Sequence, residues 1–176
     1  FHSPSTMSRI RLVYFVFIFL LPCMTYFFHE CVHWLAYRSI GINGRLTINT
    51  IVFSQELVLS STQNAFIYGS GVLFTLFQGV MGFVITIKRE ATFGFNILLS
   101  AAIFRWAAIL QGLISSSDEI KIGIALGMHP SIWPISISVS FFGMVYYLFR
   151  KMKFSLKTFF SNSLLFLLLT ILISLL

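Results

Sequence analysis

The residues best suited to chemistry are two histidines and a glutamate that form a His-Glu-x-x-His pattern between His29 and His33. On a helix, residues four apart lie on the same face, so both imidazoles can bind one metal ion. Glu30 projects about 100° around the helix from His29, where its carboxylate can exchange a proton with a metal-bound water. The spacing therefore predicts a zinc site with His29 and His33 as ligands and Glu30 as general base.

The motif lies at an unusual place for ionisable groups, because a largely apolar run from Ile10 to Phe28 precedes it. Ionisable side chains at membrane depth are costly and usually mark a functional site. The alternative is a buried polar network that links helices without a metal. The sequence leaves both interpretations open and favours the metal site.

The composition is typical of a protein that crosses a membrane several times. Of 176 residues, 57% are hydrophobic and only 10% are charged, and the mean hydropathy is +0.91. The net charge of +7 comes from residues in short stretches between apolar segments, with no long basic run. We therefore expect the lipid bilayer as a partner, and no nucleic acid.

Cys23 and Cys31 are the only cysteines, and they lie eight residues apart in the first apolar segment. A disulfide within one helix at that spacing is geometrically excluded. Cys31 projects away from the two motif histidines, so we do not expect it to bind the metal. Both cysteines are better explained as small apolar packing residues.

Hydropathy predicts an all-α polytopic membrane protein with about five transmembrane helices and a short β-like segment between the first and second. The expected division is an N-terminal tail, residues 1–9, and a single integral membrane domain, residues 10–176. The first apolar run resembles a signal peptide, but it lacks a cleavage site, so a retained span is expected. The predicted spans cover residues 10–40, 65–87, 92–114, 132–149 and 159–176.

Within the segment 43–64, residues 45–49 alternate between polar and apolar side chains and an apolar run, residues 51–53, follows. This pattern predicts one or two short strands, with an ordinary interfacial loop as the alternative. The second span carries small residues at helical spacing, which permit close packing of helices. These residues are Gly71, Thr75, Gly79 and Gly82. In the third span, Arg105 needs a partner or an aqueous cavity. It is either an active-site electrostatic group or a partner for Glu119, and the alternative that we favour is a structural ion pair or snorkelling.

The distribution of basic residues predicts the orientation. With five spans, one side of the membrane holds eight lysines and arginines and the other side holds three, Arg38, Arg45 and Lys121. The positive-inside rule then places the N-terminus in the cytoplasm. Because His33 lies towards the far end of the first span, the site is expected towards the non-cytoplasmic side.

A catalytic zinc usually has three protein ligands, so a third is expected. The first and third spans run in the same direction, and Asp118 lies at the predicted exit end of the third, at the depth of His33. We therefore expect Asp118 as the third ligand. Glu119, His129 and Glu56 remain alternatives, and a solvated helix end is the interpretation without a metal.

Together these features resemble the site-2 protease (M50-like) family of intramembrane zinc metalloproteases. The resemblance runs from about Ile10 to Gly127 and depends on His29-Glu30-Cys31-Val32-His33, the strand-like segment and the acidic Asp118. It implies a zinc metalloendopeptidase that cleaves membrane-protein or peptide substrates, with His29, His33 and Asp118 as zinc ligands and Glu30 as catalytic base. An accessory protein for substrate recognition is compatible with it.

The second motif departs from the family pattern, in which the aspartate lies in an Asn- and Pro-rich stretch ending Leu-Asp-Gly. Residues 112–119 contain no proline or asparagine, and no glycine follows Asp118. In this respect the chain looks more like small zincin-like membrane proteins related to the family. The competing hypothesis is a proteolytically inactive membrane scaffold or zinc-binding protein. A transporter is disfavoured because the sequence shows no internal repeat.

Overall fold

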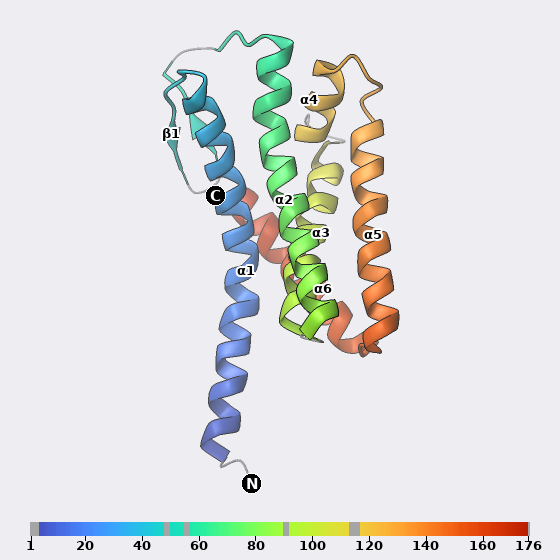
Figure 1. Ribbon diagram of the computed structural model, residues 1–176. Helices are drawn as coiled ribbons and strands as arrows, with labels where there is room; N and C mark the ends of the chain where they lie inside the picture. The colour runs from blue at the N-terminus through green and yellow to red at the C-terminus, as the bar shows by residue number, and fades with distance from the viewer. Residues whose placement is uncertain (1–3, 48–49, 55–56, 90–91, 113–116, 176) are drawn as a thin grey trace.

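The computed structural model describes residues 4–175 except 48–49, 55–56, 90–91 and 113–116. Within this part of the chain, the fold is a bundle of helices with one small antiparallel hairpin (Figure 1). The elements are α1 (Pro4–Ser39), β1 (Arg45–Leu46), β2 (Ile51–Val52), α2 (Ser61–Arg89), α3 (Thr92–Gly112), α4 (Asp118–Ala125), α5 (Ile132–Met152) and α6 (Leu156–Ser174).

Five of these helices are long and apolar enough to cross a membrane, which confirms the predicted all-α polytopic architecture. The spans are Val16–Ser39, Ser61–Arg89, Thr92–Leu110, Ile132–Met152 and Leu156–Ser174. The chain is thus a multi-pass membrane protein, and its apolar outer surface is suited to lipid. Helices α3 and α5 begin at the predicted residues 92 and 132, and the other ends differ from the predicted boundaries by a few residues, as is usual for helix termini.

One element was not expected, because the sequence interpretation treated the segment from Ile120 onward as a connection. The structure contains the short helix α4 there, and its first residue is Asp118. The prediction that Asp118 lies at the exit end of the third span is therefore wrong, since α3 ends at Gly112. An eight-residue helix is too short to stand out in a hydropathy profile, although Ser117 before two acidic residues is a typical helix start.

Helix α1 continues through Pro22 and ends where the backbone of Gly41 turns with a positive φ of 82°. The amide of Ile42 donates to the carbonyl of Tyr37 at 3.0 Å, a common way to close a helix C-terminus. The chain then forms the β1–β2 hairpin, which confirms the predicted β-like segment. The ring of Phe53, just after β2, lies 4.7 Å from that of Tyr37, so the hairpin packs against the end of α1.

The stripe of small residues on α2 is buried, as predicted, and allows three different close contacts. A side chain at Gly82 would meet the α3 backbone at 2.6–2.7 Å, and one at Gly79 would meet Phe141 of α5. A side chain at Gly71 would collide with the imidazoles of His29 and His33. The backbone of α2 therefore lies directly against the motif on α1.

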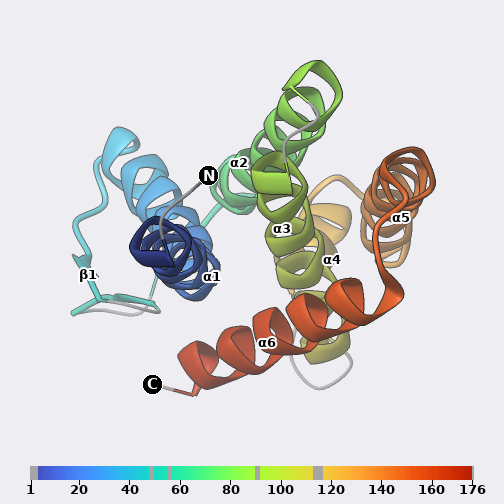
Figure 2. The ribbon, with the colours of Figure 1, turned by 90° about the horizontal axis from the view of Figure 1, so that it is seen from below.

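Hydrogen bonds between buried polar side chains hold the bundle together. Gln78 of α2 donates to the hydroxyl of Thr25 of α1 at 2.7 Å, and that hydroxyl lies 3.1 Å from the hydroxyl of Ser100 of α3. Asn162 of α6 donates to Asn96 of α3 at 3.1 Å. Such bonds favour association of helices in lipid. Figure 2 shows α6 crossing the bundle so that its C-terminal end lies beside α1.

Candidate metal centre

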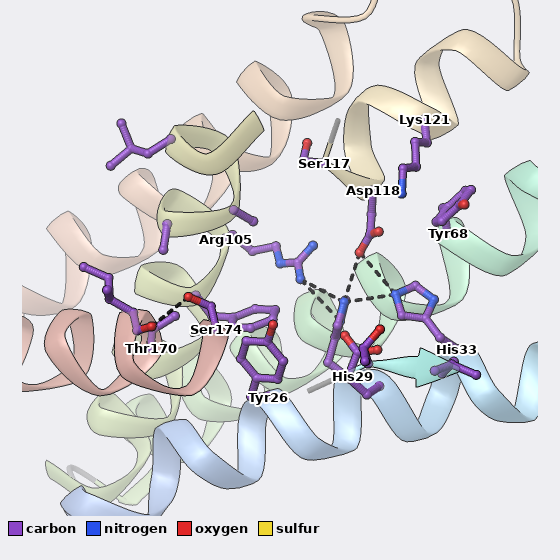
Figure 3. A pocket seen from close by; sticks show the side chains of 18 of the residues that line it. Tyr26, His29, His33, Tyr68, Arg105, Ser117, Asp118, Lys121, Thr170 and Ser174 are labelled. Carbon is purple, nitrogen blue, oxygen red and sulfur yellow. Dashed lines mark hydrogen bonds and ion pairs between the residues drawn. The ribbon is translucent and has the colours of Figure 1, made fainter. Parts of the chain in front are cut away.

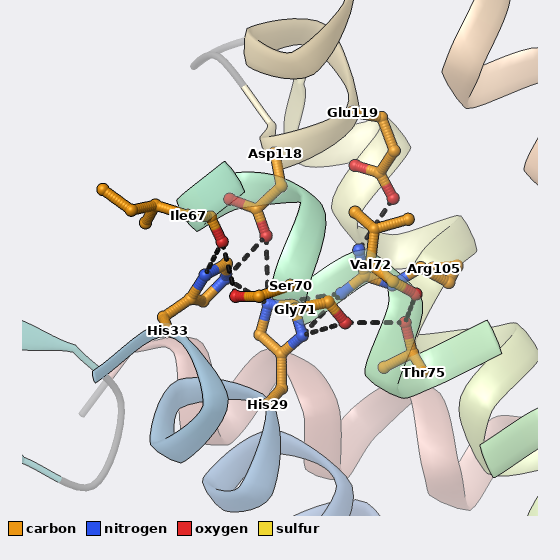
Figure 4. A network of polar contacts seen from close by, with 10 residues as sticks. All are labelled: His29, His33, Ile67, Ser70, Gly71, Val72, Thr75, Arg105, Asp118 and Glu119. Atoms are coloured by element: carbon orange, nitrogen blue, oxygen red, sulfur yellow. Dashed lines mark hydrogen bonds and ion pairs between the residues drawn. The ribbon is translucent and has the colours of Figure 1, made fainter. Parts of the chain in front are cut away.

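The two motif histidines point from α1 towards α2, where backbone carbonyls bind one nitrogen of each ring (Figure 4). The Nδ1 atom of His29 lies 3.0 Å from the carbonyl oxygen of Gly71, and that of His33 lies 2.8 Å from the carbonyl oxygen of Ile67. A carbonyl oxygen only accepts hydrogen bonds, so each Nδ1 carries the proton. In the neutral imidazole each Nε2 then presents a lone pair, as metal-binding histidines require.

Asp118 completes a compact triangle of possible ligand atoms. Its Oδ2 lies 3.0 Å from Nε2 of His29 and 3.1 Å from Nε2 of His33, and the two Nε2 atoms are 3.0 Å apart. Both histidines are buried, while the side chain of Asp118 is 20% exposed. The three atoms converge on one point, and among the described residues this is the cluster whose spacing suits a metal ion.

This triangle fits a zinc ion. Ligand atoms about 2.0–2.1 Å from a tetrahedral zinc lie roughly 3.3 Å from one another, slightly more than the observed spacing. Two nitrogen lone pairs and a carboxylate oxygen at such distances repel one another unless a proton or a cation lies between them. Three ligands on one side leave a fourth position towards the cavity, which is the arrangement of catalytic rather than structural zinc sites.

Asp118 is held in the charged form that a metal ligand needs. Burial alone raises the pKa of this carboxyl group, but hydrogen bonds and charge interactions with His29 and His33 lower it more. The pKa of Asp118 consequently lies well below its ordinary value. The carboxylate is therefore ionised at neutral pH and requires no deprotonation before binding a cation.

A buried ion pair lies directly behind the triangle. Arg105 of α3 donates through Nη1 to Oε1 of Glu119 at 2.8 Å, and their side chains are 1% and 0% exposed. The Nη2 atom of Arg105 lies 3.3 Å from Nδ1 and 3.4 Å from Nε2 of His29, so the guanidinium lies against this imidazole. The pair of Arg105 with Glu119 is one of the alternatives that the sequence left open, and the structure contains it. It connects α3 to α4 at the residue next to Asp118.

The triangle opens into a cavity of about 690 Å³ between α1, α3, α6 and the hairpin (Figure 3). Glu30 lines this cavity together with the two histidines and Asp118. Tyr26 and Tyr37 of α1 line it as well, so the face of α1 that carries the two histidines is turned towards the cavity. A volume of this size is usual for ligand pockets.

The other candidates for the third ligand lie elsewhere. Glu119 is engaged by Arg105. His129 is exposed beyond α4, where its Nδ1 accepts a hydrogen bond from the backbone amide of Ser131 at 3.3 Å. Glu56 falls outside the described residues. Of the candidates that the structure describes, Asp118 alone joins the two histidines.

Three features of the site were not found from the sequence. Gly71 was noted only for helix packing, although its carbonyl and its missing side chain both serve His29. Lys121 and Tyr68 line the cavity and were not considered as site residues. Spacing within α4 could have suggested Lys121, because residues 118 and 121 share a helix face. The place of Tyr68 in the cavity wall depends on how α2 packs against its neighbours, and no local sequence pattern indicates this packing.

Comparisons with models of protein families, with curated proteins and with solved structures find no match to this chain. The activity must therefore be inferred from the chemistry of the site. Two imidazoles and two carboxyl groups in the same cavity are suited to metal binding, to acid–base catalysis, or to both.

Proposed function

We propose that this protein is an intramembrane zinc metalloprotease, similar to the site-2 protease (M50-like) family, that hydrolyses peptide bonds of membrane-embedded substrates. One observation carries the proposal: the Nε2 atoms of His29 and His33 and the Oδ2 atom of Asp118 converge on one point at the edge of a cavity lined by Glu30. Three protein ligands, an open fourth position and a nearby carboxylate are what zinc-dependent hydrolysis requires.

When bound, zinc supplies Lewis-acid chemistry, which makes water more acidic and polarises a peptide carbonyl. His29, His33 and Asp118 would hold the ion, and the carbonyls of Ile67 and Gly71 keep both imidazoles oriented. Glu30 takes a proton from the attacking water and returns it to the leaving amine.

The walls of the cavity suit a peptide substrate. Peptide groups of a transmembrane helix are hidden in hydrogen bonds, so a substrate must unwind before its carbonyls reach the site. The hairpin contributes Thr50, Ile51 and Phe53 to the cavity wall, so an extended peptide at the site would lie beside this segment. We expect the cavity on the non-cytoplasmic side, because the positive-inside rule places the opposite end of the bundle in the cytoplasm.

The decisive experiment measures zinc per chain in detergent-purified protein and in the His33→Ala and Asp118→Ala variants. We expect about one zinc per chain in the unchanged protein and a large loss in both variants. Cys31→Ser is the control, because this half-buried residue of the same helix does not line the cavity. Folded protein that binds no zinc even after the metal is supplied would contradict the proposal.

The alternative function is a zinc-binding or metal-free scaffold without protease activity, which the buried Arg105–Glu119 pair and the interhelical hydrogen bonds favour. The Glu30→Gln variant separates the two functions. An enzyme should keep its zinc and lose cleavage of a membrane substrate by a factor of about 10²–10⁴, the usual contribution of a general base. Processing that is independent of both Glu30 and zinc chelation would favour the scaffold.

A further inference from the structure

A lysine ammonium group lies inside the cavity that contains the proposed metal ligands. Lys121 follows Asp118 by three residues on α4, so the two side chains leave the same face of this helix. The Nζ atom of Lys121 lies 4.3 Å from the centre of the Tyr68 ring on α2. Figure 3 shows the side chain pointing from α4 towards this ring, beside Asp118.

Of the described acidic groups around the cavity, Glu30 interacts with Lys121 through its charge alone, and the others have closer partners. The other cation of the lining, Arg105, is paired with Glu119, and Asp118 contacts the two histidines. Glu30 is the proposed catalytic base. Within the described part of the chain, Lys121 forms no ion pair, and the face of Tyr68 is its aromatic contact. A cation–π contact leaves the N–H groups of an ammonium free to donate to an acceptor.

Tyr68 also lines a second cavity, of about 640 Å³, which shares Tyr37 and Phe53 with the first. The remaining wall of this second cavity is mostly apolar and consists of Leu57, Val58, Leu59 and Asn64. Because Tyr68 lines both cavities, Lys121 lies near the junction between the cavity with the metal ligands and this second cavity. A peptide that reaches from the metal ligands into the second cavity would pass this ammonium.

We propose that Lys121 binds a carboxylate group of the peptide substrate and selects peptides that carry this group near the cleaved bond. The inference rests on the proposed proteolytic function and adds a specificity to it. A carboxylate accepts charge-assisted hydrogen bonds from an ammonium, whereas an amide at the same place is bound more weakly. The carboxylate belongs either to an acidic side chain or to the C-terminus of the substrate.

The test uses three dipeptides, each with a hydroxamate group at its N-terminal end. The hydroxamate chelates zinc, so the probes bind at the metal as inhibitors and are not cleaved. The probes are leucyl-alanine with a free carboxylate, leucyl-alanine amide, and leucyl-glutamate amide. Their affinities for the zinc-loaded full chain in detergent are measured by calorimetry. We expect a carboxylate probe to bind about tenfold tighter than leucyl-alanine amide, as for one hydrogen bond between charged groups. Tighter binding of leucyl-alanine would identify a C-terminal carboxylate as the group that Lys121 binds, and tighter binding of leucyl-glutamate amide would identify a side-chain carboxylate.

Three variants assign the effect to Lys121. Lys121→Met should abolish the advantage of the carboxylate, and Lys121→Arg should retain most of it. Lys151→Met removes a lysine that is exposed at the end of α5 and should change nothing. Equal binding of all three probes, or an advantage that survives Lys121→Met, would overturn the inference while the zinc-dependent binding itself still supports the protease. If no probe binds in the presence of zinc, the proposed function and this inference both fail.

Discussion

Two backbone carbonyls of α2 determine which nitrogen of each motif histidine faces the cavity. They can do so because Gly71 has no side chain, so that the helix backbone approaches the two rings closely. The same carbonyl of Gly71 accepts hydrogen bonds from His29 and from the hydroxyl of Thr75. Partners of this kind usually affect metal affinity almost as much as the ligands do, because they orient the rings.

The Gly71→Ala variant tests this close approach. The added methyl group would collide with the rings of His29 and His33, so either the imidazoles or α2 must move. We expect zinc affinity, measured by competition with a chelator, to fall about 10–100-fold. Gly69→Ala is the matched control, because a side chain at this position of the same helix meets no atom within 4 Å. A Gly71→Ala protein with unchanged zinc affinity would contradict the assignment.

At the scale of elements, the third ligand depends on a short helix that is not part of α3. Asp118 starts α4, which packs mainly against α2 and is also joined to α3 by the ion pair of the neighbouring Glu119 with Arg105. Removing one partner of a buried ion pair is strongly destabilising, because it leaves an unpaired charge in the interior. Replacing both partners by apolar residues is often much less costly.

This difference allows two effects of the ion pair to be measured separately: its effect on the stability of the bundle and its effect on the position of Asp118. We expect Glu119→Gln to lower the free energy of unfolding by about 3–5 kcal/mol. The double variant Arg105→Met with Glu119→Leu should recover most of this stability but still bind zinc more weakly, since α4 is no longer connected to α3. Denaturant unfolding and zinc competition are measured on the same samples. If the double variant binds zinc as tightly as the unchanged protein, the pair does not position Asp118.

At the scale of the whole molecule, hydropathy was sufficient to predict five spans, because about 20 apolar residues are needed to cross a bilayer. The pairing of His29 with His33 follows from helix geometry alone. The start of α4 at Asp118 was missed, since a short helix between turns has little periodicity. The contact between Lys121 and Tyr68 joins α4 to α2, and tertiary contacts of this kind leave no pattern in one sequence.

The alternation of the five spans places the site at one end of the bundle. Figure 1 shows the hairpin and α4 at the same end of the bundle, whereas α2 and α5 have their C-terminal ends at the other. The latter end carries Lys88, Arg89, Arg150 and Lys151, while Arg45 and Lys121 lie near the former. Because basic residues are enriched on the cytoplasmic side, we expect the hairpin, α4 and the cavity to face away from the cytoplasm.

Single cysteines introduced at exposed positions at the two ends can test this orientation. In a background with Cys23→Ser and Cys31→Ser, Ser131→Cys reports on the end with α4, and Ser155→Cys on the α5–α6 turn. A thiol reagent that does not cross membranes should label Ser131→Cys in intact cells, and Ser155→Cys only after permeabilisation. The opposite pattern would place the cavity in the cytoplasm. Peptides would then reach Glu30 from the cytoplasmic side, and substrates should be sought among membrane proteins with cleavage sites near that surface.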